Sequence, residues 1–202
     1  MARRKKRKSE LVPALIAIAI VLALSSFFAP FVFITIVQDA FHQQVNGIWM
    51  FAAPLSSYIV GGAALLYLAL VVVILAFYQS KVKGKKLRKA VGTFVAFVPG
   101  IIFIYLSMNQ YFYFTDRGIY QNHLFAMHEH FYPWSEMEQA QAVSKNKDGQ
   151  VSLARLELTT KQHKVLHYRY TTDLIHIQRD IRDALDEYDV GLEQKLEGKE
   201  AE

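Results

Sequence analysis

The chain has 202 residues, of which 52% are hydrophobic, and a formal net charge of +5. Residues 1–109 hold twelve Lys or Arg and two acids, whereas residues 110–202 hold eleven Lys or Arg and sixteen acids. The basic residues lie at the ends of apolar runs rather than on one folded face, so this charge does not indicate nucleic-acid binding. The absence of cysteine excludes disulfides, thiolate metal ligands, a thiol nucleophile and a lipid-modified cysteine.

Three uncharged runs predict transmembrane helices at residues 11–37, 56–78 and 90–108. A helix of about 20 apolar residues spans a bilayer. The first run follows a basic segment, residues 1–10, but it is longer than the roughly 7–15 residues of a signal-peptide core. The small residues at 61–64 predict the closest helix contact and could also support a homo-oligomer.

The three predicted spans contain no Asp, Glu, Lys, Arg or His. Ion paths, proton relays and intramembrane active sites usually need such groups inside the bilayer. The sequence therefore argues against a transporter, a pump or an intramembrane protease.

Two basic clusters, residues 3–8 and 81–89, predict which side of the membrane each loop occupies. Both should be cytoplasmic, which places residues 38–55 and everything after residue 108 outside. If the third run were re-entrant, the C-terminal domain would be cytoplasmic instead. Residues 38–55 are either an ordinary loop or a short amphipathic helix with Phe41, Val45 and Ile48 on one face.

After residue 110 the apolar residues alternate, which predicts strands and turns. The expected strands are residues 111–115, 118–125, 130–134, 137–144, 150–159 and 164–170. A break in the alternation near Arg155 predicts a β-bulge. An apolar stripe through Leu174, Ile181 and Leu185 predicts a helix over residues 173–188, packed on the sheet. Residues 191–202 are expected to form a frayed, charged tail.

Two short segments carry a resemblance to a known family. Residues 114–120 (Phe-Thr-Asp-Arg-Gly-Ile-Tyr) and 132–138 (Tyr-Pro-Trp-Ser-Glu-Met-Glu) resemble the signatures of bacterial pleckstrin-homology-like (PH-like) domains, which follow transmembrane helices in small bacterial membrane proteins. The resemblance covers roughly the last ninety residues. It implies a PH-like antiparallel β-barrel or sheet over residues 110–190, capped by a C-terminal helix, that binds or scaffolds rather than catalyses.

The histidines supply the only candidate metal ligands. His128 and His130 would share one face of a strand, and His163 and His167 the outward face of another. Such pairs could hold a metal with a carboxylate, or titrate near neutral pH. Exposed histidines explain the same spacing, and no cofactor is expected.

No nucleotide-binding, metalloprotease or serine-nucleophile motif occurs, so we expect no enzymatic activity. The expected function is a multi-pass protein of the bacterial cell membrane that presents its PH-like domain to a lipid headgroup, a peptide or another membrane protein. One alternative, implied by the resemblance, is an envelope-stress or antimicrobial-peptide immunity factor. Another is a histidine-based metal- or pH-responsive regulator. The expected contact surface comprises Tyr111, Tyr113, Tyr120, His128, His130 and Tyr132.

Overall fold

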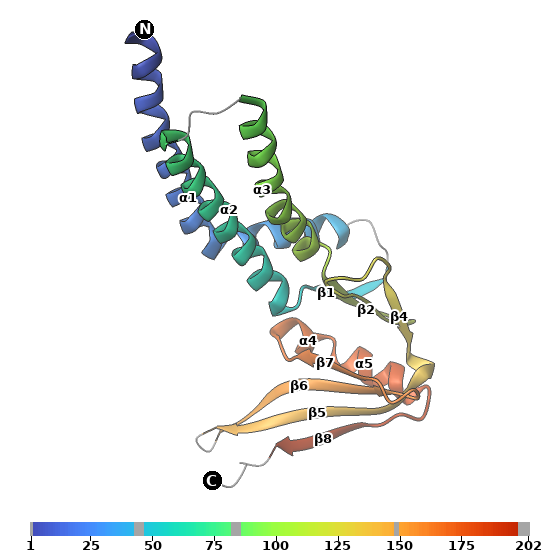
Figure 1. Cartoon of the computed structure of the whole chain (residues 1–202). Helices are drawn as coiled ribbons and strands as arrows, with labels where there is room; N and C mark the ends of the chain where they lie inside the picture. The colour runs from blue at the N-terminus through green and yellow to red at the C-terminus, as the bar shows by residue number, and fades with distance from the viewer. Residues whose placement is uncertain (1, 43–46, 82–85, 148–149, 198–202) are drawn as a thin grey trace. The chain divides into compact units, whose positions relative to one another are not determined.

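The computed structural model describes residues 2–42, 47–81, 86–147 and 150–197. The chain divides into two compact units (Figure 1). The helical unit comprises Met1–Gln44, Ala52–Tyr111 and Asn122–His128. The strand unit comprises Val45–Phe51, Phe112–Gln121 and Glu129–Glu202.

The helical unit contains three long helices, as predicted. They are α1 (Ala2–His42), α2 (Leu55–Lys81) and α3 (Lys86–Met108). Their apolar portions are Leu11–Val37, Leu55–Tyr78 and Val91–Met108, each long and apolar enough to cross a membrane. At 1.5 Å per residue even the shortest measures about 27 Å, close to the roughly 30 Å hydrocarbon core of a bilayer. These lengths and compositions are those of a multi-pass membrane protein.

Glycines set the spacing between these helices. A Cβ added at Gly62 would lie 2.9 Å from the backbone oxygen of Ser26 in α1, and one added at Gly61 would lie 3.2 Å from Pro30. On α3, a Cβ at Gly100 would lie 2.4 Å from Leu68 of α2. The Gly61–Gly62 surface is thus occupied by α1 of the same chain. A second copy of the chain would have to use another surface.

The strand unit contains two four-stranded sheets. The first sheet has the order β1-β2-β3-β4 and the second β7-β6-β5-β8. Their strands are β1 (Ile48–Ala52), β2 (Tyr111–Thr115), β3 (Gly118–Asn122), β4 (His130–Pro133), β5 (Met137–Lys147), β6 (Gln150–Thr160), β7 (Val165–Arg169) and β8 (Leu192–Glu197). The sheets and helices make an α+β architecture, as predicted. Within the described residues neither sheet closes into a barrel.

The segment between α1 and α2 differs from both sequence-based expectations. The α1 helix continues through His42, Val45 lies outside the described residues, and Ile48 begins strand β1. This strand is the edge of the first sheet, next to β2. Neither an ordinary loop nor an amphipathic helix therefore describes residues 48–52. The short run Ile-Trp-Met-Phe-Ala has the β-branched and aromatic residues typical of a strand.

Three further expectations need correction. Strand β3 ends at Asn122 rather than residue 125. The expected C-terminal helix is two helices, α4 (Thr172–His176) and α5 (Gln178–Asp186), separated at Ile177. The expected frayed tail forms β8, which pairs in parallel with β5. The sequence of β8, Leu-Glu-Gln-Lys-Leu-Glu, has no polar–apolar alternation, and most of its side chains remain exposed, so it gave no signal of a strand.

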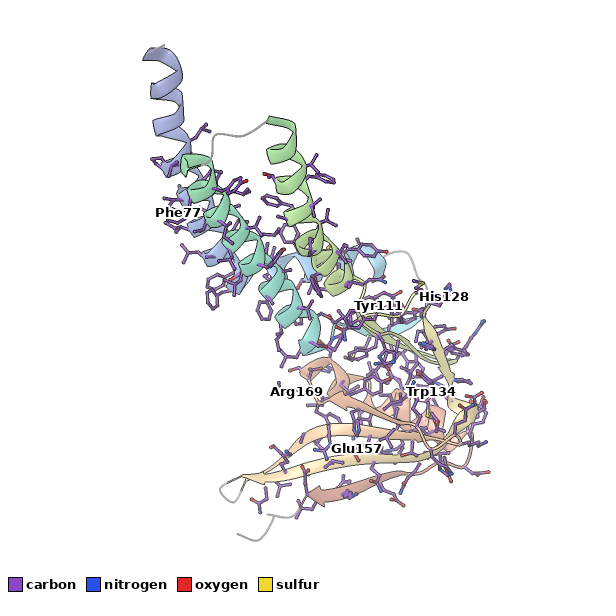
Figure 2. The ribbon with its side chains drawn as sticks, viewed as in Figure 1. Phe77, Tyr111, His128, Trp134, Glu157 and Arg169 are labelled. Atoms are coloured by element: carbon purple, nitrogen blue, oxygen red, sulfur yellow. The ribbon has the colours of Figure 1, made fainter. Side chains whose placement is uncertain are left out.

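Trp134 is central to the core of the strand unit (Figure 2). It lies in a short 3-10 helix, η1 (Trp134–Glu136), between β4 and β5. Its side chain is 1% exposed, and its indole Nε1 donates a hydrogen bond to the Thr115 backbone oxygen at 3.0 Å. The other fully buried large side chains of this core include Phe114, Ile119, Met137, Leu156, Leu158, Leu174, Ile181 and Leu185.

Substitution of Gly62 by Ala should weaken the packing of α1 on α2. The added methyl group would meet a backbone oxygen, which cannot rotate away. We expect a loss of about 1–3 kcal/mol in unfolding free energy, the cost of overpacking. Denaturant titration of the purified chain in detergent measures this loss of unfolding free energy.

Gly92→Ala is the matched control, because a Cβ at Gly92 on α3 would meet no atom within 4 Å. Its effect should stay within about 0.5 kcal/mol, as for a surface substitution. Equal stability of the Gly62→Ala and Gly92→Ala variants would contradict the close approach of α1 and α2.

Candidate binding site

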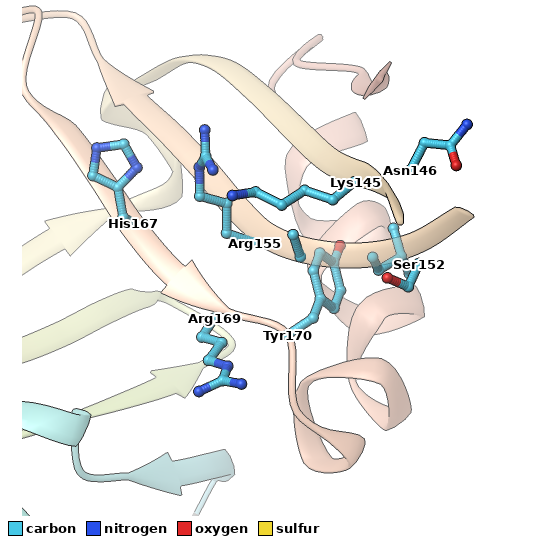
Figure 3. Close-up of a pocket in the computed structure, with 9 residues that line it drawn as sticks. Lys145, Asn146, Ser152, Arg155, His167, Arg169 and Tyr170 are labelled. Carbon is cyan, nitrogen blue, oxygen red and sulfur yellow. The ribbon is translucent and has the colours of Figure 1, made fainter. Parts of the chain in front are cut away.

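A cavity of about 750 Å³ lies on the second sheet, toward one end of β5, β6 and β7 (Figure 3). This volume falls within the roughly 300–1,000 Å³ typical of small-molecule sites. The cavity is lined by Lys145, Asn146, Ser152, Leu153, Ala154, Arg155, His167, Arg169 and Tyr170. All of these residues belong to the strand unit.

A β-bulge shapes this part of the sheet. Val143 pairs with Arg155, but the next residue of β5, Ser144, pairs with Leu153, which leaves Ala154 of β6 as the extra residue. The backbone oxygen of Ala154 accepts a hydrogen bond from the Tyr170 N–H at 3.1 Å. Bulges bend a strand and redirect its side chains. The predicted bulge near Arg155 is therefore confirmed, and it lies in the cavity wall.

An ion-pair network joins the four strands of the second sheet beside the cavity. The Arg155 guanidinium makes two hydrogen bonds of 3.1 Å to the two Glu197 carboxylate oxygens, and its Nε donates to Glu157 at 2.5 Å. Lys145 lies 3.3 Å from Glu197, and His167 lies 3.4 Å from Glu157. Planar, bidentate pairing of this kind is geometrically specific. Strand β8 supplies Glu197 and so completes the network.

The network shifts the pKa values of its members. Hydrogen bonds from Arg155 hold the pKa values of Glu157 and Glu197 below their usual range, against the opposing effect of desolvation. The same bonds, that to Glu197 foremost, raise the pKa of Arg155. Both carboxylates are therefore charged at neutral pH, and Arg155 is already engaged by them.

Two further cations line the cavity. Lys145 pairs with Glu197 but is 57% exposed, and Arg169 is exposed at the cavity, with its side chain directed away from Arg155 in Figure 3. Burial raises the pKa of Tyr170, so its hydroxyl is protonated at neutral pH. Within the described part of the chain this buried hydroxyl has no hydrogen-bond partner. Cations and hydroxyl donors together suit an anionic oxygen group.

The first sheet carries an aromatic ladder, one ring from each strand: Phe51, Tyr113, Tyr120 and Phe131. Successive ring centroids lie 5.9, 4.8 and 4.4 Å apart, and each pair is stacked. Aromatic pairs of this kind each contribute about 0.5–1.5 kcal/mol beyond burial. The ladder therefore holds the four strands in register as well as providing an aromatic face.

The residues of the predicted contact surface do not share one face of the first sheet. Tyr113 and Tyr120 belong to the ladder, whereas Tyr132 pairs with Ile119 and is buried on the opposite face. The Tyr132 hydroxyl accepts a hydrogen bond from Lys164 Nζ.

The remaining members of that predicted surface lie elsewhere. The His130 ring stacks on Tyr132 with centroids 6.5 Å apart, on the face opposite the ladder. His128 is exposed in the loop before β4, and Tyr111 begins β2 (Figure 2). Tyr111 and His128 belong to the helical unit. Of the six residues, Tyr113 and Tyr120 share the aromatic ladder, whereas His130 and Tyr132 stack on the opposite face.

The histidine pairs do not share strand faces as expected. His128 precedes β4, so only His130 lies on that strand. His163 lies in the turn before β7 with a φ of 61°, while His167 lies on β7. Each of His163 and His167 lies near one carboxylate, Glu138 and Glu157 respectively. In the described ranges no three His, Cys, Asp or Glu side chains gather as metal ligands would.

Sequence reasoning did not identify the cavity residues. The interrupted alternation near Arg155 marked the bulge, but nothing in it showed that Tyr170 and Lys145 would meet there. The sequence placed Glu197 in the expected frayed tail, residues 191–202. Its role depends on the parallel pairing of β8 with β5, which brings together residues more than 40 positions apart.

Acid should weaken the Arg155 network. A carboxylate with a lowered folded-state pKa stabilises the fold above its unfolded pKa, about 4.5 for Glu157, and this stabilisation is lost as the pH falls through the folded-state value. Glu157→Gln should lower stability at pH 7 by about 1 kcal/mol, a modest figure because Arg155 is one-third exposed.

Thermal unfolding of the purified chain in detergent, recorded from pH 7 to pH 3, tests this expectation. The Glu157→Gln variant should lose less stability on acidification than the parent chain. Glu187→Gln, which changes an exposed carboxylate after α5, is the control and should follow the parent curve. If Glu157→Gln also followed the parent curve, the network would not stabilise the domain.

No protein-family model matches the chain, and no curated protein matches it significantly.

Proposed function

We propose that this chain is a non-enzymatic, multi-pass membrane protein whose PH-like domain binds an anionic oxygen group, carboxylate or phosphate, in the cavity of the second sheet. The single observation that supports it most is the donor set of that cavity. Lys145 and Arg169 supply positive charge, and the Tyr170 hydroxyl lacks an internal partner among the described residues. An unpaired buried hydroxyl costs free energy that a ligand oxygen would recover.

The PH-like assignment is part of this proposal. Strands β2 to β7 followed by helices α4 and α5 have the order expected for such a domain, and the pairs β3–β4, β5–β6 and β6–β7 are antiparallel. Strands β1 and β8 are additions to that order. Because neither sheet closes into a barrel among the described residues, the proposed binding module presents an open sheet face.

The proposed location is the extracytoplasmic side of the cell membrane. Strand β1 follows α1 and strand β2 follows α3, yet they are neighbours in one sheet. This pairing favours three full crossings over a re-entrant third helix, because β1 and β2 must lie on the same side of the membrane. Cytoplasmic loops of membrane proteins carry an excess of Lys and Arg. The basic segments 3–8 and 81–89 therefore favour the cytoplasm as the compartment on the other side of the membrane from the sheet.

The alternative functions have less support. His163 and His167 each lie beside a single carboxylate, which is the geometry of local ion pairs rather than of a metal site. A cavity with exposed cations is unsuited to capture cationic antimicrobial peptides. The proposed ligand class is therefore anionic.

Binding can be tested on the full chain in nanodiscs of zwitterionic lipid. Inorganic phosphate and a glutamate-rich peptide are the two soluble probes, and anionic lipid added to the nanodisc is the third. We expect at least one probe to shift the NMR signals of the amides of residues 152–155, which line the cavity. The responding probe distinguishes free, peptide-borne and lipid-borne anions.

Arg169→Gln and Tyr170→Phe should each weaken the response severalfold, because they remove a cation and a hydroxyl while keeping most of the side-chain volume. Arg179→Gln removes an exposed cation on α5, outside the cavity, and is the matched control. No shift with any probe, or an equal loss with Arg179→Gln, would contradict the proposed site.

A further inference from the structure

The loop between β3 and β4 exposes large apolar side chains. Phe125 is 74% exposed and Met127 is 93% exposed, the latter the highest value among the exposed large hydrophobic residues described. By contrast, the exposed large apolar residues described in the strand unit, such as Val151 and Leu196, occur singly along the sequence. Here Leu124, Phe125, Ala126 and Met127 follow one another, and such concentrated exposure indicates an interaction surface.

The local backbone presents these residues at a tip. The Ala126 N–H donates a hydrogen bond to the His123 backbone oxygen at 2.9 Å, which closes a four-residue turn. Leu124 and Phe125 are the two central residues of that turn. A turn with this sequence is unusual, because turns favour Gly, Pro, Asn, Asp and Ser.

Charge is also absent from this region. Residues 118–128 contain no Asp, Glu, Lys or Arg, although residues 110–202 contain 27 such residues in total. Charged side chains cost free energy in a loop that faces lipid, but not in a loop that faces water. The composition therefore favours an apolar environment.

The compact unit to which the β3–β4 loop belongs indicates what surrounds the loop. Asn122–His128 belongs to the same compact unit as the three apolar helices, although the strands on either side of it belong to the strand unit. The helices of that unit have the length and composition of membrane spans. A protein partner or a second copy could also cover an apolar loop, but continuity with membrane-spanning helices favours lipid.

We propose that the β3–β4 loop inserts Phe125 and Met127 into the interfacial layer of the bilayer crossed by α1, α2 and α3. Interfacial segments bury their apolar residues about 5–10 Å into the headgroup and acyl boundary. The loop is then a fourth membrane contact, made by the domain itself. This inference does not depend on the proposed anion cavity.

The absence of cysteine allows a direct test with single labels on the full chain. Phe125→Cys and Met127→Cys, each carrying a polarity-sensitive fluorophore, are reconstituted in vesicles of zwitterionic lipid. We expect blue-shifted emission, severalfold weaker quenching by aqueous iodide than at a water-exposed site, and strong quenching by lipids with a nitroxide near the headgroup. Val151→Cys on β6, 61% exposed in the strand unit, is the matched control and should be quenched by iodide alone.

A further variant separates insertion from mere proximity to lipid. Phe125→Asp in the Met127→Cys chain should restore iodide quenching of the label, because a carboxylate disfavours insertion. Iodide quenching of the label at position 125 equal to that at Val151 would overturn the proposal. Protection from both iodide and nitroxide lipid would also overturn it, since that result indicates a protein surface over the loop.

Discussion

The pairing of β1 with β2 is the constraint on which the architecture depends. Strand β1 lies between α1 and α2 in the sequence, and β2 begins just after α3. In the proposed topology, this sheet requires the end of α1, the start of α2 and the end of α3 to meet the same aqueous compartment. The short connection between α1 and α2 is therefore a structural part of the first sheet. A third helix that entered and left on one side of the membrane would be incompatible with this pairing.

The cavity depends on two further features of the second sheet. The extra residue Ala154 bends β6, and its backbone oxygen binds the N–H of Tyr170, so the bulge fixes where β7 ends. Strand β8 then brings Glu197 to Arg155, which leaves that guanidinium engaged and the charges of Lys145 and Arg169 at the cavity. Anion recognition by this surface would thus rest on neighbours of the ion-pair network rather than on Arg155 itself.

The helices and most strands could be predicted because their signals are local. Uncharged runs of sufficient length identify α1, α2 and α3, and alternation identifies β2, β5, β6 and β7. Strand β1 was missed because five residues beside a membrane helix show no periodicity that separates a strand from an interfacial loop. Strand β8 was missed because its residues, half of them charged and most of them exposed, gain stability from parallel pairing with β5 rather than from a buried face.

The candidate site was less predictable than the fold. Tyr113 and Tyr120, both members of the expected contact surface, are neighbours in the aromatic ladder, whereas strand alternation places Tyr132 on the other face. The cavity combines Lys145, Arg155 and Tyr170 from three strands or their ends, and only the register of the sheet brings them together. Local patterns carry no information about such register, particularly where a bulge shifts it by one residue.

Accessibility of single cysteines in intact cells tests the central claim most directly. Asn46→Cys, Gly84→Cys and Lys161→Cys place one thiol in the segment before β1, one between α2 and α3, and one in the turn before β7. With an impermeant thiol reagent, we expect labelling at positions 46 and 161 and none at position 84. Labelling at 46 without 161 would contradict the shared side that the β1–β2 pairing requires. Labelling at 84 alone would contradict the proposed orientation.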